Sequence, residues 1–383
     1  MTYHWSLTCS GCPTDAAPDG LPTVCPECGA PWLVRYERAP EPGLKTLLAA
    51  RPWTMWRYRE WLPLLDGEAP VTLGEGGTPL LDAPRLAERA GVAKLWIKDE
   101  SMNPTGSFKA RGLSAAVTRA RHAGAQGFTV PTAGNAGVAT SAYGRRAGLP
   151  VHVFAPRTTP PRILEQVRTF GAELQLLDGH IGDCGKAARA HAAAHGSFDM
   201  STLREPYRIE GKKTLGLEVA EQLGWQLPDA AIYPTGGGTG LIGMWIAFRD
   251  LLAAGWVTGK APRLYSVQSE GCAPVVQAFE QRASRTEPWP NPETVAAGLR
   301  VPAPLGGPII LRALEETGGE ALAVSDEALT RAADAMATSE AVDACPEGGA
   351  TLAALHTLVQ RGSIGADESV VLFNTGAGWL YRS

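Results

Sequence analysis

The stretch NPTGSFKARG, residues 103–112, surrounds one lysine with turn residues, an aromatic ring and the start of an apolar pattern. Behind Lys109 the run RGLSAAVTRA places apolar residues three or four apart, so a helix is expected to begin near the lysine. The positive end of a helix dipole and the neighbouring Phe108 both favour the neutral amine. A neutral amine is the form that attacks a carbonyl. The alternative interpretation of Lys109 is a solvated surface lysine.

The length and composition of the chain limit the possible roles of this lysine. With 383 residues the chain exceeds a typical single domain, and two α/β domains are expected. A net charge of -4 shows no bias toward nucleic acid or an anionic membrane. The sequence has neither an apolar run of membrane-spanning length nor the basic-then-apolar order of a signal peptide. We therefore expect a cytoplasmic protein without nucleic-acid or membrane partners.

Four of the seven cysteines form two closely spaced pairs, CSGC and CPEC, separated by twelve residues. This spacing is typical of two metal-binding knuckles that close a tetrahedral thiolate site. Four thiolates leave no open position for a substrate, so the predicted zinc is structural. The alternative is that these thiols carry no metal. The predicted metal ligands are Cys9, Cys12, Cys25 and Cys28, whereas Cys184, Cys272 and Cys345 are expected to be small buried residues.

Beyond residue 40 short apolar runs alternate with helical patterns, an order typical of mainly parallel sheets covered by helices. Ligands of such sheets bind beyond the carboxyl ends of the strands. The irregular residues 281–310 are predicted to be a surface excursion or an active-site flap, and the alternative is an inert linker. Strands are predicted at 95–98, 127–132, 151–156, 174–177, 230–235, 264–269 and 370–375, and helices at 114–124, 139–148, 162–171, 215–225, 240–256 and 349–362.

A glycine cluster follows the strand predicted at 230–235 and directly precedes a helix. Successive N–H groups without side chains at a helix start form a phosphate site. The cluster lacks the Lys-Ser/Thr of a nucleotide P-loop and the spacing of a dinucleotide fingerprint, so a phosphate from another compound is favoured. The alternative is a tight turn. Together with Lys109, the phosphate site suggests pyridoxal phosphate, and the residues predicted to bind its phosphate are Gly236, Gly237, Gly238, Thr239 and Gly240.

Six segments together give the chain a family resemblance. It resembles the fold-type II pyridoxal-phosphate enzymes of the tryptophan synthase β type and, among them, the threonine synthases, some relatives of which also carry a zinc ribbon. The resemblance covers nearly all of the chain after the ribbon. The matching segments are GEGGTPL (74–80), KDESMNPTGSFKARG (98–112), PTAGNAG (131–137), EPYRIEGKKTLG (205–216), PTGGGTGL (234–241) and FNTGAGW (373–379).

The resemblance implies roles for residues around the cofactor. Lys109 would form the Schiff base and shuttle protons at the substrate's Cα and Cβ, with Phe108 packed near the cofactor. Asn135 would face the phenolic oxygen, and Thr375 would meet the pyridine nitrogen. Because a hydroxyl does not hold that nitrogen protonated as a carboxylate would, chemistry at the side chain is expected.

The resemblance also implies a β,γ-replacement in which O-phosphohomoserine and water give threonine and phosphate. The substrate carboxylate would be held by Thr132, Ala133 and Gly134. The leaving phosphate would meet Arg208 and Lys212, with Arg111 as a further candidate. The alternative for all three basic residues is a charge on a helix surface.

Departures from the family pattern leave other reactions open. Ala110 stands where the family commonly has a carboxylate, and residues 203–208 lack a hydroxyl and an amide found in many threonine synthases. An apolar pair, Trp379 and Leu380, replaces a pattern that ends in lysine. A threonine or serine dehydratase, or another replacement enzyme on the same cofactor, is the nearest alternative, and a non-catalytic zinc-ribbon binding module is a remote one.

The domain layout predicted from the resemblance has three parts. The zinc ribbon occupies residues 1–40, and residues 41–108 with 206–383 form a large cofactor-binding α/β domain. Residues 109–205 form a small α/β domain that carries the substrate carboxylate loop. Enzymes of this fold type are usually dimers, so a homodimer acting on a small amino-acid substrate is expected.

Overall fold

The computed structural model describes residues 4–382. Contacts divide the chain into two compact units. The first comprises the chain through Gly76 together with Lys109–Thr214, and the second comprises Gly77–Phe108 together with the chain from Leu215 onward. The three domains drawn from the sequence stay a prediction, and the compact units place residues 41–76 and 206–214 in the first unit. None of the helices within the described range has the length and apolar character that crossing a bilayer requires.

The first unit begins with a small antiparallel sheet in the strand order β2-β1-β3. Along β1 every second residue, Trp5, Leu7 and Cys9, is buried, as the period of two along a strand requires. The turns that follow β1 and precede β3 carry the two cysteine pairs. The strands are β1 (Trp5–Cys9), β2 (Asp15–Ala16) and β3 (Trp32–Tyr36).

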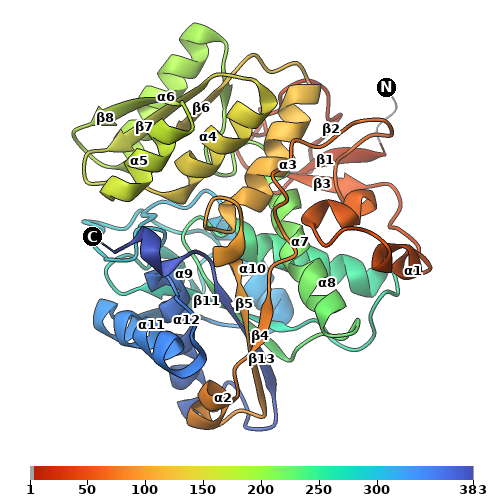
Figure 1. Cartoon of the computed structure of the whole chain (residues 1–383), viewed down its shortest axis with the longest axis vertical. Coiled ribbons are helices and arrows are strands. Elements are labelled where there is room, and N and C mark those ends of the chain that lie inside the picture. The colour runs from red at the N-terminus through yellow and green to blue at the C-terminus, as the bar shows by residue number, and fades with distance from the viewer. Residues whose placement is uncertain (1–3, 383) are drawn as a thin grey trace. The chain divides into compact units, whose positions relative to one another are not determined.

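The remainder of the first unit is an α/β sandwich around a four-stranded sheet. Its order is β8-β7-β6-β9, and all neighbouring strands are parallel. Helices α4, α5 and α6 pack on these strands (Figure 1). The strands are β6 (Phe128–Pro131), β7 (Val151–Pro156), β8 (Glu173–Leu177) and β9 (Phe198–Asp199), and the helices are α1 (Leu44–Ala49), α3 (Lys109–His122), α4 (Asn135–Ala147), α5 (Pro161–Thr169), α6 (Ile181–His195) and α7 (Tyr207–Gln222), of which residues through Thr214 belong to this unit, with a 3₁₀ helix at Met55–Trp61.

Helices α3 and α7 cross at two glycines. A Cβ on Gly211 would lie 2.2 Å from the carbonyl oxygen of Arg111, and a Cβ on Gly112 would lie 2.9 Å from the carbonyl oxygen of Arg208. Both obstacles are backbone atoms, which do not move aside as a flexible side chain would. Only glycine on each helix therefore permits this crossing.

The second unit is built on a six-stranded sheet in the order β12-β11-β10-β13-β5-β4. Four of its five strand pairs are parallel, and only β4 runs antiparallel to its neighbour β5. The prediction of mainly parallel sheets is confirmed. The strands are β4 (Leu80–Asp82), β5 (Lys94–Asp99), β10 (Ala230–Pro234), β11 (Arg263–Ser269), β12 (Ala321–Val324) and β13 (Ser369–Asn374), and the helices are α2 (Pro84–Ala90), α8 (Thr239–Ala253), α9 (Pro274–Glu280), α10 (Gly307–Thr317), α11 (Asp326–Glu340) and α12 (Pro346–Gln360), with 3₁₀ turns at Glu100–Met102 and Gly378–Leu380.

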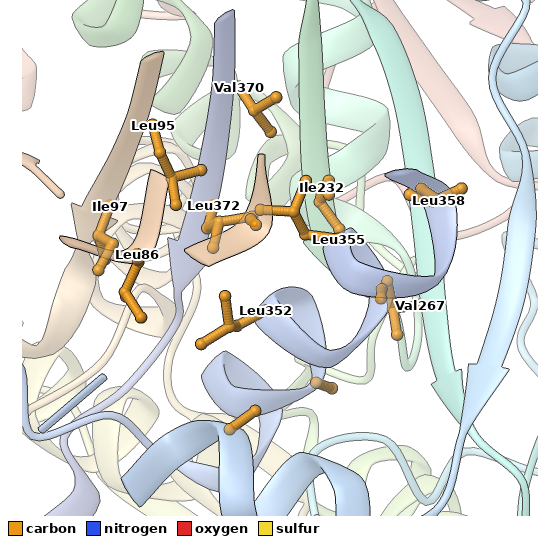
Figure 2. Close-up of a cluster of buried hydrophobic side chains, with 14 of the residues drawn as sticks. Leu86, Leu95, Ile97, Ile232, Val267, Leu352, Leu355, Leu358, Val370 and Leu372 are labelled. Atoms are coloured by element: carbon orange, nitrogen blue, oxygen red, sulfur yellow. The ribbon is translucent and has the colours of Figure 1, made fainter. Parts of the chain in front are cut away.

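Helix α12 supplies much of the core of the second unit. Its leucines Leu352, Leu355 and Leu358 are fully buried among the side chains of β5, β10, β11 and β13 (Figure 2). Their spacing of three residues keeps them on one face of the helix. Each buried leucine contributes about 1.5–3 kcal/mol relative to an exposed one, so this face holds α12 against the sheet.

The irregular segment between α9 and α10 is packed against the second unit. Ala296 and Leu299 are buried in its core, and the N–H of Gly298 donates to Glu347 Oε1 over 2.6 Å. The interpretation of residues 281–310 as an inert linker is therefore wrong.

Replacement of Gly211 by alanine tests the crossing of α3 and α7. We expect Gly211→Ala to lower the free energy of unfolding by about 2–3 kcal/mol, because its methyl group forces the two backbones apart. Chemical denaturation followed by circular dichroism measures the change. Gly43→Ala is the control, since Gly43 has a negative φ and open space around its Cβ position. A Gly211→Ala variant as stable as Gly43→Ala would contradict this account of the crossing.

Candidate functional site

Three parallel strands of the second unit, β10, β13 and β5, end at the same edge of the sheet. Parallel neighbours share direction, so the loops that follow their carboxyl ends lie beside one another. Asn374 at the end of β13 donates from Nδ2 to Asp99 Oδ1 at the end of β5 over 2.8 Å. Residues 235–240, a glycine turn and the first residues of α8, follow β10, and Thr375 follows β13. This edge therefore carries two of the segments singled out in the sequence.

The glycine turn is shaped so that side chains are excluded. A Cβ on Gly236 would lie 2.2 Å from the carbonyl oxygen of Gly298, and one on Gly240 would lie 1.9 Å from the Tyr233 hydroxyl. Gly238 has a φ of +77°, in the left-handed region that favours glycine. The turn leads into α8, which begins at Thr239 and has no side-chain hydrogen bond at its N-cap. Its first N–H groups are thus offered without a competing side chain, as a bound anion requires.

Phe108 and Thr375 are brought together by backbone pairing. The N–H of Phe108 donates to the carbonyl oxygen of Thr375 over 3.0 Å, and the N–H of Ala377 donates to that of Gly106 over 2.9 Å. The Phe108 ring meets Tyr233 edge-on with centroids 6.0 Å apart. Since Tyr233 also contacts the glycine turn, Phe108, Thr375 and that turn belong to one edge of the second unit.

A buried hydroxyl lies in the same segment. Ser107 is fully buried, and its Oγ has no hydrogen-bond partner among the residues that the structure describes. An isolated buried hydroxyl costs free energy unless a further group satisfies it. The antiparallel bridge between Ser107 and Gly376 places the backbone of Ser107 beside the residues after β13. A buried hydroxyl thus accompanies the uncapped turn on the second unit.

Two residues near Thr375 were missed by the sequence reasoning about chemistry. The Cys345 thiol lies 3.8 Å from Thr375 Oγ1, donates to Asn374 Oδ1 over 3.4 Å and caps α12 by accepting from the Gly348 N–H. Burial raises the pKa of the Cys345 thiol well above its usual value, so the thiol is protonated. Glu347 is also buried, and its Oε2 has no hydrogen-bond partner within residues 4–382. The position of Cys345 directly before Pro-Glu at a helix start is the signal that would have identified it as a cap.

Cys184, Cys272 and Cys345 are all buried, which confirms the prediction from the sequence that they are small buried residues.

Lys109 is the first residue of α3, as the sequence indicated. The side chain is half-buried, and the first turn of α3 contains no acidic residue. A neighbouring carboxylate would stabilise the ammonium form, whereas the helix dipole disfavours it. Lys109 therefore lies at the positive end of the α3 dipole.

Asn135 is likewise the first residue of its helix, α4, and it is buried. The loop before it is braced by Thr132, whose Oγ1 accepts from the N–H groups of Gly134 and Gly137 over 3.0 Å each. The same hydroxyl donates to the carbonyl oxygen of Gly134 over 2.7 Å. In this structure Thr132 shapes the loop from within, whereas Ala133 and Gly134 are half-buried.

The basic residues predicted to meet the substrate phosphate are buried. Arg111 and Lys212 have no exposed surface and Arg208 is 2% exposed, so their interpretation as helix-surface charges is wrong. Arg111 donates to Thr214 Oγ1 over 3.0 Å, and Arg208 donates from a terminal nitrogen to the carbonyl oxygen of Met200 over 2.7 Å. Both acceptors are neutral groups of the same unit.

Glu205 lies beside Arg208 with its carboxylate 3.9 Å from Arg208 Nε. Burial raises the pKa of Glu205 to about 7, against the opposing effect of Arg208 and of two N–H donors. Burial also lowers the pKa of Arg208. Desolvation thus outweighs the attraction between the two charges.

A buried carboxylate in the first unit positions the helices that carry Lys109 and Asn135. Glu75 accepts hydrogen bonds from four donors and has no exposed surface. Because Ser114 lies on α3 and Tyr143 on α4, a single charge ties both helices to the segment 55–75. The sequence reasoning missed this role, since Glu75 appeared there only as part of a matching motif. The donors are Trp56 Nε1 at 2.8 Å, Leu73 N at 2.9 Å, Ser114 Oγ at 2.5 Å and Tyr143 Oη at 2.6 Å.

The cysteine pairs converge on one point. All four sulfurs lie within 4.8 Å of one another, with 3.4 Å between those of Cys9 and Cys28 and 3.7 Å between those of Cys12 and Cys25. Tetrahedral ligation at a bond length of about 2.3 Å separates neighbouring sulfurs by roughly 3.8 Å. The chain therefore has a cluster of four free cysteines with the geometry to hold a metal ion.

A family model described as pyridoxal-phosphate dependent enzyme matches residues 71–376, which is most of the chain. The chain belongs to this family. It is similar to a threonine synthase of Methanosarcina acetivorans, with 34% identity over 376 residues that cover 98% of this chain and 91% of the relative. The resemblance drawn from the sequence is thereby confirmed, and the protein is a pyridoxal-phosphate-dependent lyase related to threonine synthases.

Solved structures agree on the fold of this pyridoxal-phosphate-dependent enzyme. A maize serine racemase superimposes with a TM-score of 0.69 at 22% identity over 79% of this chain and 88% of its own. A threonine deaminase from T.th. gives a TM-score of 0.67 at 26% identity, over 80% of this chain and 93% of its own. The fold-type II assignment is therefore confirmed.

The pH dependence of stability tests the buried state of Glu205 in this pyridoxal-phosphate-dependent enzyme. A carboxyl whose pKa rises from 4.5 to about 7 on folding stabilises the fold fully below pH 4.5, and this contribution is lost as the pH rises through 7. The side chain in Glu205→Gln still accepts hydrogen bonds but stays neutral at every pH. The variant therefore does not lose stability in this pH range. We expect the stability of Glu205→Gln relative to wild type to increase by about 3 kcal/mol between pH 4.5 and 7.

Urea denaturation at several pH values measures this difference. Glu88→Gln, at an exposed position of α2, is the control and should track the wild type. Parallel pH profiles for wild type and Glu205→Gln would show that Glu205 ionises in the folded protein as it does in water.

Proposed function

We propose that this enzyme converts O-phosphohomoserine and water into threonine and inorganic phosphate. The observation that carries the proposal is the similarity to a threonine synthase across 98% of the chain. The segments that bear the predicted site residues all lie within that span. The similarity to a threonine deaminase is lower, at 26% identity. A β,γ-replacement, in which phosphate leaves Cγ and water adds at Cβ, is therefore favoured over dehydration.

The residues of the second unit fit pyridoxal phosphate. The uncapped glycine turn before α8 would take its phosphate on N–H groups, and the crowding at Gly236 by backbone and at Gly240 by the Tyr233 side chain leaves that surface bare of side chains. Thr375 would meet the pyridine nitrogen, with its hydroxyl beside the protonated Cys345 thiol. When bound, the cofactor supplies an aldehyde for the substrate's amino group and a conjugated ring that withdraws electrons.

Lys109 would bond the cofactor's aldehyde at rest and, once displaced by substrate, would move protons at Cα and Cβ. A general base works best with a pKa near the working pH, and Lys109 would act from the first position of α3. Asn135 would hold the phenolic oxygen of the cofactor. The loop of Thr132, Ala133 and Gly134 would bind the substrate carboxylate, with Thr132 bracing the loop that presents its N–H groups.

Arg208 and Lys212, with Arg111, would hold the phosphate that leaves Cγ. Four basic and two acidic residues are buried where α3 crosses α7, namely Arg111, Arg208, Lys212 and Lys213 against Glu205 and Glu210. Glu210 is paired with Lys213, and burial favours the neutral form of Glu205. Guanidinium and ammonium groups are the side chains that suit a phosphate dianion. The homodimer and the cytoplasmic location stay predictions.

Product analysis with purified enzyme and added pyridoxal phosphate tests the function. O-Phosphohomoserine should give threonine and inorganic phosphate in equal amounts, and Lys109→Ala should lower kcat by at least about a thousandfold because it removes the proton carrier. Lys260→Ala, at an exposed position of the second unit, is the control and should keep full activity. Release of an α-keto acid and ammonia from threonine, without turnover of O-phosphohomoserine, would identify a dehydratase.

We also propose that the cysteine cluster holds one structural zinc ion. Purified protein should contain one zinc per chain, and Cys12→Ser should lose it, because the turns around the cysteines need metal ligation to fold. Elemental analysis measures the content, and cobalt replacement should give the absorption of a tetrahedral thiolate site. Thr23→Ala, on the exposed loop between the pairs, should keep its zinc. Protein that folds without any bound metal would refute the proposal.

A further inference from the structure

The last residue of the zinc ribbon's sheet reaches into the buried charges of α7. Tyr36 ends β3, and its hydroxyl donates to Glu210 Oε2 over 2.7 Å. Lys213 Nζ donates to the same carboxylate oxygen over 2.7 Å and lies 4.3 Å from the centroid of the Tyr36 ring. One tyrosine thus contacts both members of an ion pair, by a hydrogen bond to the anion and by its ring face to the cation.

This ion pair has no access to water. Glu210 is 1% exposed and Lys213 is fully buried. A buried pair is stable only when additional hydrogen bonds replace the lost hydration. The Tyr36 hydroxyl supplies such a bond, and its ring covers the ammonium group. The ribbon is therefore part of the environment that allows these two charges to remain on α7.

The first two turns of α7, residues 207–214, carry both this ion pair and the residues proposed to bind the substrate phosphate. Arg208 and Lys212 are four residues apart and hence on one face of the helix. Gly211, between Glu210 and Lys212, is in close contact with the backbone of α3. Helix α7 is thus held on one side by α3 and on another by Tyr36. Loss of the Tyr36 contact would remove one of the contacts that set the position of these turns.

The place of Tyr36 depends in turn on the ribbon. Tyr36 pairs with Trp5 across β1 and β3, and Cys9 pairs with Trp32 at the opposite end of the same two strands. A sheet with two strands of five residues and one of two is too small to be stable without further support. The cysteine cluster at its end supplies that support when metal is bound.

We propose that Tyr36 is a positioning residue through which the metal-held ribbon sets the first two turns of α7 and thereby the phosphate-binding geometry of Arg208 and Lys212. The identity of the bound anion rests on the proposed function, whereas the coupling between the ribbon and α7 does not. The ribbon thus acts on substrate affinity and has no part in the chemistry at Cα.

Tyr36→Phe tests this coupling, because it removes the hydroxyl and keeps the ring over Lys213. Two measurements on the holoenzyme need no turnover: the dissociation constant of inorganic phosphate by calorimetry, and amide hydrogen exchange in residues 207–214. Loss of a hydrogen bond to a buried charge should weaken phosphate binding roughly tenfold and accelerate exchange in these residues. In the turnover assay KM for O-phosphohomoserine should rise by a similar factor, with kcat and the cofactor absorption band unchanged.

Arg35→Gln is the matched control, since Arg35 is the neighbouring residue and points to the exposed side of β3, where it pairs with Asp15. It should change none of these readouts. Removal of the metal from wild type with a chelator should reproduce the accelerated exchange in residues 207–214. Unchanged phosphate affinity and exchange in Tyr36→Phe would overturn the inference. If both shift but O-phosphohomoserine is not turned over, the inference stands and the proposed function fails.

Discussion

The first unit depends on one buried carboxylate. Glu75 is removed from water, so its charge is tolerable only because several donors meet it at once. These donors come from the 3₁₀ helix at Met55–Trp61, from Leu73 in the loop just before Glu75, and from the two long helices α3 and α4. The two helices begin with Lys109 and Asn135, so the network that satisfies the charge also sets the relative positions of the residues proposed to contact the cofactor's aldehyde and phenolic oxygen.

The second unit also contains buried charges that are satisfied by several partners. Lys98 and Glu218 form a fully buried ion pair at 2.7 Å, and Lys98 also donates to the carbonyl oxygen of Thr78. Glu218 accepts in addition from the N–H of Gly77. Removing one partner would leave a buried charge uncompensated, which costs more than the pair itself contributes. The pair therefore fixes β5 and the segment before β4 against α7, and β5 is one of the three strands that end at the candidate site.

Much of the candidate site could be predicted from the sequence, because its residues stand where local rules apply. Lys109 and Asn135 follow turn residues and precede apolar patterns, and each proved to be the first residue of its helix. The glycine turn before α8 carries the same local signal. The burial of Arg111 and Lys212 could not be predicted, since it results from two glycines that let α3 and α7 approach. The contacts of Cys345 and Glu75 were missed for the same reason: their partners lie far away in sequence.

The sequence by itself predicted the approximate places of several helices and strands, that the sheets are mainly parallel, and that four thiols are spaced to hold a metal. These features follow from periodicity, capping and spacing within short windows. Only the tertiary structure decided the strand order, the antiparallel β4, the contact of Tyr36 with α7 and the buried charges. Each of these depends on which distant segments pack together. A buried charge needs partners and a crowded position needs glycine, but the neighbouring residues in the sequence do not show which positions will be buried.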